Sequence, residues 1–203
     1  MPPPREIIDG LESVLGIYFS DFRHRERAAF ILCDELIEMA CKLKAREHNH
    51  LFDMAVGFNA CWKAPGVAIP SPSLGASIQH SRNTRNNMQH ASAAATVDDR
   101  HCADAILDAV KVIDHCWPTA STNDFSGWIK CALRVIRLYS SHGNPNQRMP
   151  FEDAMRDGEW RAEKRQARQN EFLMRPGLKR FWALVMISSH GQVEAILNAC
   201  GIP

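Results

Sequence analysis

Apolar residues recur at intervals of three and four along most of this chain, and this spacing constrains the fold more than any other feature. The clearest case is residues 99–116, whose apolar positions fall in phase on one helix face: Ala103, Ile106, Leu107, Val110 and Ile113. Residues three and four apart share a face of a helix, so this spacing is typical of amphipathic helices. The period of two that strands require is nearly absent. The sequence therefore predicts an all-α fold.

The same pattern predicts the remaining helices and a division of the chain. Further helices are expected over residues 5–20, 22–47, 50–62, 74–93, 128–139, 151–174, 181–187 and 193–197. Ser20 and Asp21 are candidate N-caps for the second helix, and Asp98 is the candidate N-cap for the helix over residues 99–116. We expect a helical bundle over residues 1–118 and a C-terminal helical extension over residues 119–203 that packs on the bundle.

Residues 80–90 interrupt this apolar frame with concentrated polar side chains. The segment holds two arginines, two histidines and three asparagines, and Met88 is its only apolar residue. Arginine presents a planar fork that matches phosphate. Histidine exchanges a proton near neutral pH, and asparagine can orient a hydroxyl or a phosphate oxygen. The combination suits an anionic substrate whose conversion needs proton transfer.

Helical spacing leaves open how these side chains meet. Arg82, Asn86 and His90 share one stripe of a regular helix, whereas Arg85 lies roughly 140° round the helix from His90. Arg85 and His90 therefore meet only if the helix begins or bends between them, or if they meet across a partner. Arg85 could instead be a structural arginine that pairs with an acid of the second helix. Arg82 is interpreted as a solvated arginine or an auxiliary phosphate contact.

The sequence Arg85-Asn86-Asn87-Met88-Gln89-His90 resembles the Arg-polar-x-x-x-His signature of HEPN domains, helical proteins that include many bacterial ribonucleases and toxins. Residues 25–38 are similar to the long helix that precedes this signature, and the helix over residues 99–116 also fits. The resemblance implies a HEPN-like bundle and a metal-independent endoribonuclease of a bacterial defence or toxin–antitoxin system, with no cofactor. Toxins of one branch carry a tyrosine two residues after the histidine, where this chain has Ser92.

The resemblance also implies roles for single residues and partners. Arg85 would neutralise charge on a phosphate, Asn86 would orient the substrate, and His90 would be the acid or base. We expect Arg82 and Gln89 to contact RNA. The family usually dimerises with two motifs facing one cleft, so the expected partners are RNA, a second copy of the chain and a cognate antitoxin or regulatory protein. The alternative is a non-catalytic module of the same fold that binds RNA, a nucleotide or a protein.

Two charged stretches are interpreted as solvated faces. The first consists of four acids on the second helix: Glu26, Asp34, Glu35 and Glu38. One of these acids could instead support the motif arginine. The arginine-rich residues 156–175 interleave acids with bases, which is typical of a salt-bridged surface helix. The alternative for this segment is an RNA track or a partner surface.

Composition sets the remaining bounds. A formal net charge of +1 argues against a generally basic protein, so RNA binding would need a local patch. Seven cysteines without a Cys-x-x-Cys pair are interpreted as buried free thiols. The N-terminus lacks an apolar signal core and no apolar run reaches membrane length. We therefore expect a cytoplasmic protein with no membrane partner.

Overall fold

The computed structural model describes residues 2–68, 71–90, 96–118, 125 and 127–169, of which His90 and residues 163–169 are described by their backbone alone. Over these residues the fold is all-α, which confirms the predicted class. The elements are α1 (Arg5–Tyr18), α2 (Arg25–His48), α3 (Phe58–Trp62), α4 (Pro72–His90), α5 (Asp99–Cys116), α6 (Gly127–Tyr139), the 3₁₀ turn η1 (Pro145–Gln147) and α7 (Phe151–Gln169).

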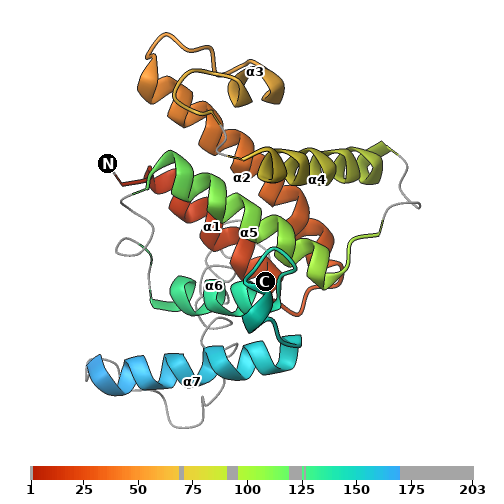
Figure 1. Cartoon of the computed structure of the whole chain (residues 1–203), viewed down its shortest axis with the longest axis vertical. Helices are drawn as coiled ribbons and strands as arrows, with labels where there is room; N and C mark the ends of the chain where they lie inside the picture. Colours follow the sequence, from red (N-terminus) through yellow and green to blue (C-terminus); the bar gives the residue numbers. More distant parts are fainter. Residues whose placement is uncertain (1, 69–70, 91–95, 119–124, 126, 170–203) are drawn as a thin grey trace, which may run out of the picture.

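Helix α5 is the centre of the bundle and contacts α1, α2, α4 and α6 (Figure 1). Its predicted bounds are confirmed, and the apolar stripe that predicted it is buried. The Asp98 carboxylate accepts a hydrogen bond from the backbone N–H of His101 at 2.8 Å, which confirms the predicted N-cap. This cap satisfies one of the backbone donors that a helix N-terminus leaves open.

Helix α4 lies across α2 and α5 and extends toward the edge of the molecule, well away from α7 (Figure 1). Its buried side chains Leu74, Ile78 and Met88 join the common core. From α2, the Arg27 guanidinium donates a 2.8 Å hydrogen bond to the carbonyl oxygen of Met88, near the C-terminal end of α4. Both ends of α4 are thereby fixed to the bundle.

Two local predictions are wrong. The expected helix over residues 50–62 is reduced to α3, because Asn49 and Asp53 accept hydrogen bonds from the N–H groups of Leu51 and Ala55. Such side-chain turns compete with helix formation. Ser20 and Asp21 do not cap α2, which begins after His24 in a left-handed conformation. The Ser20 hydroxyl instead donates to the Ile17 carbonyl at the end of α1.

Helix α6 packs on α1 and α5, and α7 packs on α6. The Trp128 indole donates to Glu12 of α1 at 2.9 Å, and Arg134 pairs with Asp157 of α7 at 3.0 Å. Arg156 and Arg161 also pair with acids of their own helix, which confirms a salt-bridged surface for this part of the arginine-rich segment. The division at residue 118 stays a prediction. Residues 170–174 and the helices expected beyond them lie outside the described residues.

Six of the seven cysteines are buried and form no disulfide, as predicted, and Cys200 lies outside the described residues. They are Cys33, Cys41, Cys61, Cys102, Cys116 and Cys131. None of the helices in the described ranges combines the length and the apolar character needed to cross a membrane.

Replacing Gly143 by alanine is expected to lower the free energy of unfolding by about 3 kcal/mol. A Cβ at this position would overlap the carbonyl oxygen of Arg137, a backbone atom that cannot move away without distorting α6. Urea denaturation measures the loss. Gly57→Ala is the matched control, since a Cβ there meets nothing within 4 Å. Equal stability of the two variants would contradict the expectation.

Candidate functional site

The predicted site residues lie on one continuous helix. Helix α4 begins at Pro72 and includes both Arg85 and His90, so the possibility that a helix begins between them is wrong. The segment from Arg85 to His90 forms the C-terminal part of α4. On a regular helix these two residues therefore point roughly 140° apart.

Arg82 is a structural arginine in a cluster with α2, and its interpretation as solvated is wrong. Its Nη1 donates to both oxygens of Asp34 at 3.1 Å, and its Nη2 donates to Glu38 at 3.1 Å. The guanidinium also stacks over the Phe58 ring at 4.1 Å, so it joins three elements. Planar guanidinium groups favour such bidentate and stacked contacts. The RNA-binding role of Arg82 stays a prediction.

Asp34 is the carboxylate around which this cluster is built. Its side chain is 5% exposed, so its interpretation as part of a solvated face is wrong, and so is that of Glu38, which pairs with Lys42 at 2.8 Å. Burial raises the pKa of the Asp34 carboxyl, and the guanidiniums of Arg82 and Arg85 oppose that rise. Glu26 pairs with Arg25 at 3.1 Å, whereas Glu35 is exposed as expected.

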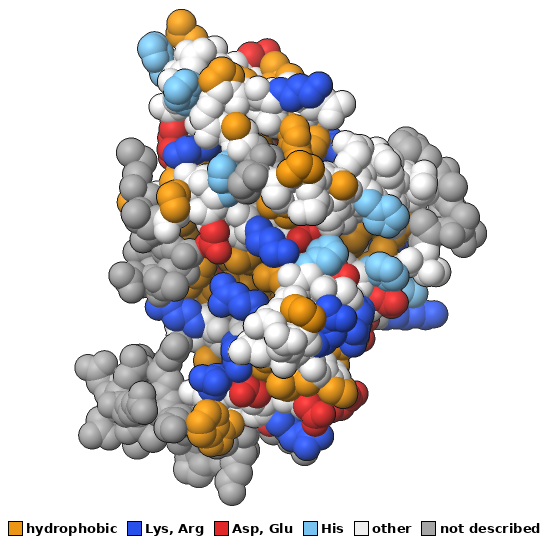
Figure 2. Space-filling model, in the orientation of Figure 1, with side chains coloured by type: hydrophobic (Ala, Val, Ile, Leu, Met, Phe, Trp, Pro, Cys, Tyr) orange, Lys and Arg blue, Asp and Glu red, His pale blue; other side chains and the backbone are white. Residues whose placement is uncertain are grey.

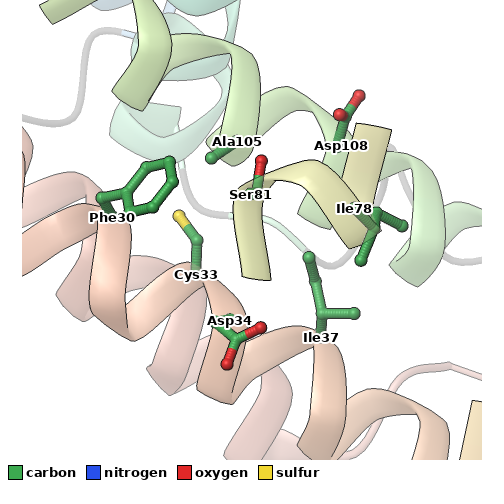
Figure 3. Close-up of a pocket in the computed structure, with 8 residues that line it drawn as sticks. All are labelled: Phe30, Cys33, Asp34, Ile37, Ile78, Ser81, Ala105 and Asp108. Atoms are coloured by element: carbon green, nitrogen blue, oxygen red, sulfur yellow. The ribbon is translucent and has the colours of Figure 1, made fainter. Parts of the chain in front are cut away.

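A sequence signal for Asp34 existed and was missed. Asp34 lies four residues after Phe30 and three before Ile37, and both of those apolar residues are buried. An acid in phase with an apolar helix face needs a cation from another element. Figure 3 shows where α2, α4 and α5 meet, with the carboxylates of Asp34 and Asp108 on different sides of the junction. Helix α4 thus contacts one buried carboxylate from α2 and another from α5.

Arg85 shares the Asp34 carboxylate and is oriented by it. Its Nε lies 3.5 Å from Asp34 Oδ2, an ion pair whose geometry leaves the buried Nε without a hydrogen bond. Its Nη1 donates to Asn86 Oδ1 at 3.1 Å. Within the described part of the chain, Nη2 of Arg85 and Nδ2 of Asn86 have no hydrogen-bond acceptor. The pairing of Arg85 with an acid of α2, considered above, is therefore present, and it leaves donors for a ligand.

The other predicted residues lie on the last turn of α4. Gln89 is exposed, and the side chain of His90 lies outside what the structure describes. The ion pairs that include Arg85 form a cluster of three cations, Arg82, Arg85 and Lys42, and two carboxylates, Asp34 and Glu38. This cluster carries one positive charge in excess. On the face drawn in Figure 2, basic and acidic side chains are intermixed. A phosphate at this site would therefore respond to a local charge and not to a broad basic surface.

A second polar cluster joins α4, α5 and the turn after α6. Asp108 of α5 is buried, and both of its oxygens lie 3.0 Å from Nδ1 of His142. The Ser77 hydroxyl donates to Asp108 at 2.5 Å, and Lys111 Nζ lies 3.3 Å from it. No sequence signal linked His142 to Asp108, because 34 residues separate them. The hydrogen bond to Asp108 raises the pKa of His142, and burial opposes that rise.

The stability of the protein is expected to depend on pH through His142. The pKa of His142 is raised in the folded state. The contribution of its protonated ring to the free energy of unfolding is therefore fully present below the unfolded-state pKa of about 6.5. The contribution is lost as the pH rises through the folded pKa. Urea midpoints measured from pH 5.5 to 9 should fall over this range more steeply for the wild type than for His142→Asn. His80→Asn, a change at an exposed histidine of α4, is the control. Parallel curves for wild type and His142→Asn would contradict this assignment.

The described ranges contain no group of at least three His, Cys, Asp or Glu residues that could bind a metal ion. Comparison of the chain with protein-family models, curated proteins and solved structures gives no match. The similarity to HEPN domains accordingly depends on the residues quoted above.

Proposed function

We propose that the C-terminal part of α4 is the active site of a HEPN-type, metal-independent endoribonuclease. The observation that supports this proposal is the placement of Arg85. Its guanidinium is oriented by Asp34 and Asn86, and among the described residues its Nη2 has no acceptor. Arg85 lies five residues before His90 on the same helix. An arginine fixed by a buried carboxylate is preorganised to receive a second anion.

The proposed reaction converts an RNA phosphodiester into a 2′,3′-cyclic phosphate. The 2′-hydroxyl of the substrate attacks the adjacent phosphorus, and His90 accepts the hydroxyl proton or donates one to the leaving 5′-oxygen. Arg85 Nη2 and Asn86 Nδ2 stabilise the charge that grows on the nonbridging oxygens. The P–O5′ bond breaks and the P–O2′ bond forms, so no cofactor is consumed.

The proposed active site is shared between two copies of the chain. Positions five apart lie roughly 140° apart round a regular helix, so a single copy is not expected to direct both Arg85 and His90 at one phosphate. A twofold axis next to α4 would place the Arg85 of one chain opposite the His90 of the other. The proposed partners are thus RNA, a second copy of this chain and a cognate antitoxin or regulatory protein of a defence system in the cytoplasm.

Incubating purified protein with labelled total RNA in EDTA is expected to yield cleavage products. Cleavage should proceed in EDTA because the proposed chemistry uses side chains alone. The 3′ ends of the products should resist phosphatase until acid opens the cyclic ester, because a cyclic phosphate is not a phosphatase substrate. Loss of cleavage in EDTA, with recovery in magnesium or manganese, would contradict the proposed mechanism. RNA binding without cleavage under either condition would favour the non-catalytic module.

A further inference from the structure

A hollow of about 450 Å³ lies beside the first half of α4 and is separate from the Arg85 region. Its walls come from three elements: the start of α4, the face of α5 that carries Asp108 and Lys111, and His142 in the turn after α6. Ser77 of this wall and Arg85 are eight residues apart, about 12 Å along a regular helix. The volume falls in the range typical of small-molecule sites.

The His142 ring is oriented by the buried carboxylate behind it. Nδ1 is bonded to Asp108, so Nε2 is the ring atom left for a ligand. Nε2 lies 3.9 Å from Asp104 Oδ2, which is too long for a hydrogen bond. Asp104 instead accepts hydrogen bonds from the Ser140 hydroxyl and the Ser141 backbone N–H at 2.8 and 2.6 Å. A carboxylate at one ring nitrogen fixes the orientation of the other.

Lys111 is the second cation of the hollow. Its ammonium donates to Asp108 and to the carbonyl oxygen of His142, at 3.3 and 3.2 Å. An ammonium group has three donors, so one remains without an acceptor among the described residues. At the rim, the hydroxyls of Ser71 and Ser73 lie 3.1 Å apart, and each hydroxyl can rotate toward a ligand.

The hydrogen-bond donors that remain select the class of ligand. Both oxygens of Asp108 are already occupied by His142, Ser77 and Lys111, so this carboxylate is not available to a cation. The groups that keep donors toward the hollow are an imidazole, an ammonium and hydroxyls. An apolar ligand would leave these donors unpaired, whereas an oxyanion with several oxygens would accept from all of them.

We propose that this hollow binds the phosphate group of a phosphomonoester, with His142 Nε2, Lys111 Nζ and the serine hydroxyls as donors. The phosphate can belong to a free mononucleotide or to the phosphorylated end of an RNA strand, since both present the same three terminal oxygens. This site does not depend on the ribonuclease activity proposed for Arg85 and His90, and it uses none of the same side chains.

Titration of the full-length protein with inorganic phosphate, followed calorimetrically, tests the site. We expect saturable binding that weakens about tenfold or more in His142→Asn and in Lys111→Gln, because each removes one charge-assisted donor. The asparagine amide can still donate to Asp108, so His142→Asn is expected to keep its fold, which far-UV circular dichroism checks. His80→Asn, on the exposed side of α4, is expected to bind as the wild type does.

Sulfate separates the titration of the protein from that of the ligand, because sulfate stays a dianion at every pH used. Wild-type affinity for sulfate should fall as the pH rises from 6 to 9, while the affinity of His142→Asn should change little. The other ionisable groups facing His142 are Asp104, Asp108 and Lys111 of α5, and Arg148 bonds the adjacent Ser141 carbonyl. Helix α4 contributes hydroxyls and Leu74 to the wall.

Two further ligands identify the source of the phosphate. Tighter binding of uridine 5′-monophosphate than of a 5′-phosphorylated oligonucleotide would assign the site to a free mononucleotide. Tighter binding of the oligonucleotide, relative to the same strand with a 5′-hydroxyl, would assign it to an RNA end. Absence of saturable binding of phosphate, sulfate and both nucleotides at millimolar concentration would overturn the proposal. Unchanged phosphate affinity in both His142→Asn and Lys111→Gln would also overturn it, whether or not the protein cleaves RNA.

Discussion

Alanine at Arg85 or at His90 is expected to lower the rate of RNA cleavage by about a hundredfold or more. Arg85→Ala removes the donor proposed for the phosphate, and His90→Ala removes the proposed acid or base. Asp34 keeps its two hydrogen bonds from Arg82 in the Arg85→Ala variant, so the fold is retained. Cleavage of labelled RNA under single-turnover conditions gives the rate, and thermal unfolding checks the fold. Asn87→Ala, at an exposed position inside the motif, is the matched control.

Substitutions at Arg82 and Arg85 distinguish the proposed active site from the residues that support it. Arg82→Ala is expected to lower both stability and cleavage, because it removes the main partner of the buried Asp34 carboxylate. Arg85→Lys keeps the charge but not the planar fork, so partial activity is expected. Full activity of Arg85→Ala, together with loss of activity but not of stability in Arg82→Ala, would move the site to the stripe of Arg82, Asn86 and His90.

Mixing the two inactive proteins tests the shared active site. Under conditions of subunit exchange, a heterodimer of Arg85→Ala and His90→Ala chains regains one intact arginine–histidine pair, contributed by different chains. Recovery of part of the wild-type rate is therefore expected. A mixture that contains verified heterodimers but stays inactive would rule out pairing between chains. Activity of a strictly monomeric protein in sedimentation would remove the shared site altogether.

Asp34→Ala is expected to lower the free energy of unfolding by about 3 kcal/mol. The variant leaves the half-buried guanidiniums of Arg82 and Arg85 without the carboxylate they share. For a chain of this size such a loss corresponds to a fall in Tm of about 6–12 °C. Denaturant and thermal unfolding measure it. Glu35→Ala, at the exposed neighbouring position, is the control and is expected to change stability by about 0.5 kcal/mol or less.

A double variant separates stability from positioning. Asp34→Leu combined with Arg82→Leu replaces the main buried ion pair by apolar side chains, which is often neutral for stability. Most of the stability lost in Asp34→Ala should return, while cleavage stays low because Arg85 no longer has a carboxylate to orient it. Stability of Asp34→Ala equal to that of Glu35→Ala would contradict the structural role of the cluster. Full cleavage by the double variant would show that Asp34 does not position Arg85.

The sequence by itself determined the helices whose signals are local. The bounds of α5 follow from its apolar period and from Asp98, because the period and the cap act within a few residues of the chain. The same local signals over-extended the third helix. There the side chains of Asn49 and Asp53 bond nearby backbone N–H groups, and this competition does not appear in an apolar pattern.

The sequence also directed attention to the polar segment of α4, since arginine, asparagine and histidine are concentrated there. Only the tertiary structure decided which of its arginines is hydrogen-bonded to acids of α2. Arg82 and Asp34 are 48 residues apart, and their pairing depends on how α4 crosses α2. The pairing of His142 with Asp108 likewise depends on where the turn after α6 meets α5. Helical periodicity assigns a residue to a face of its own helix, but the angle and position at which two helices pack determine which charged side chains come into contact.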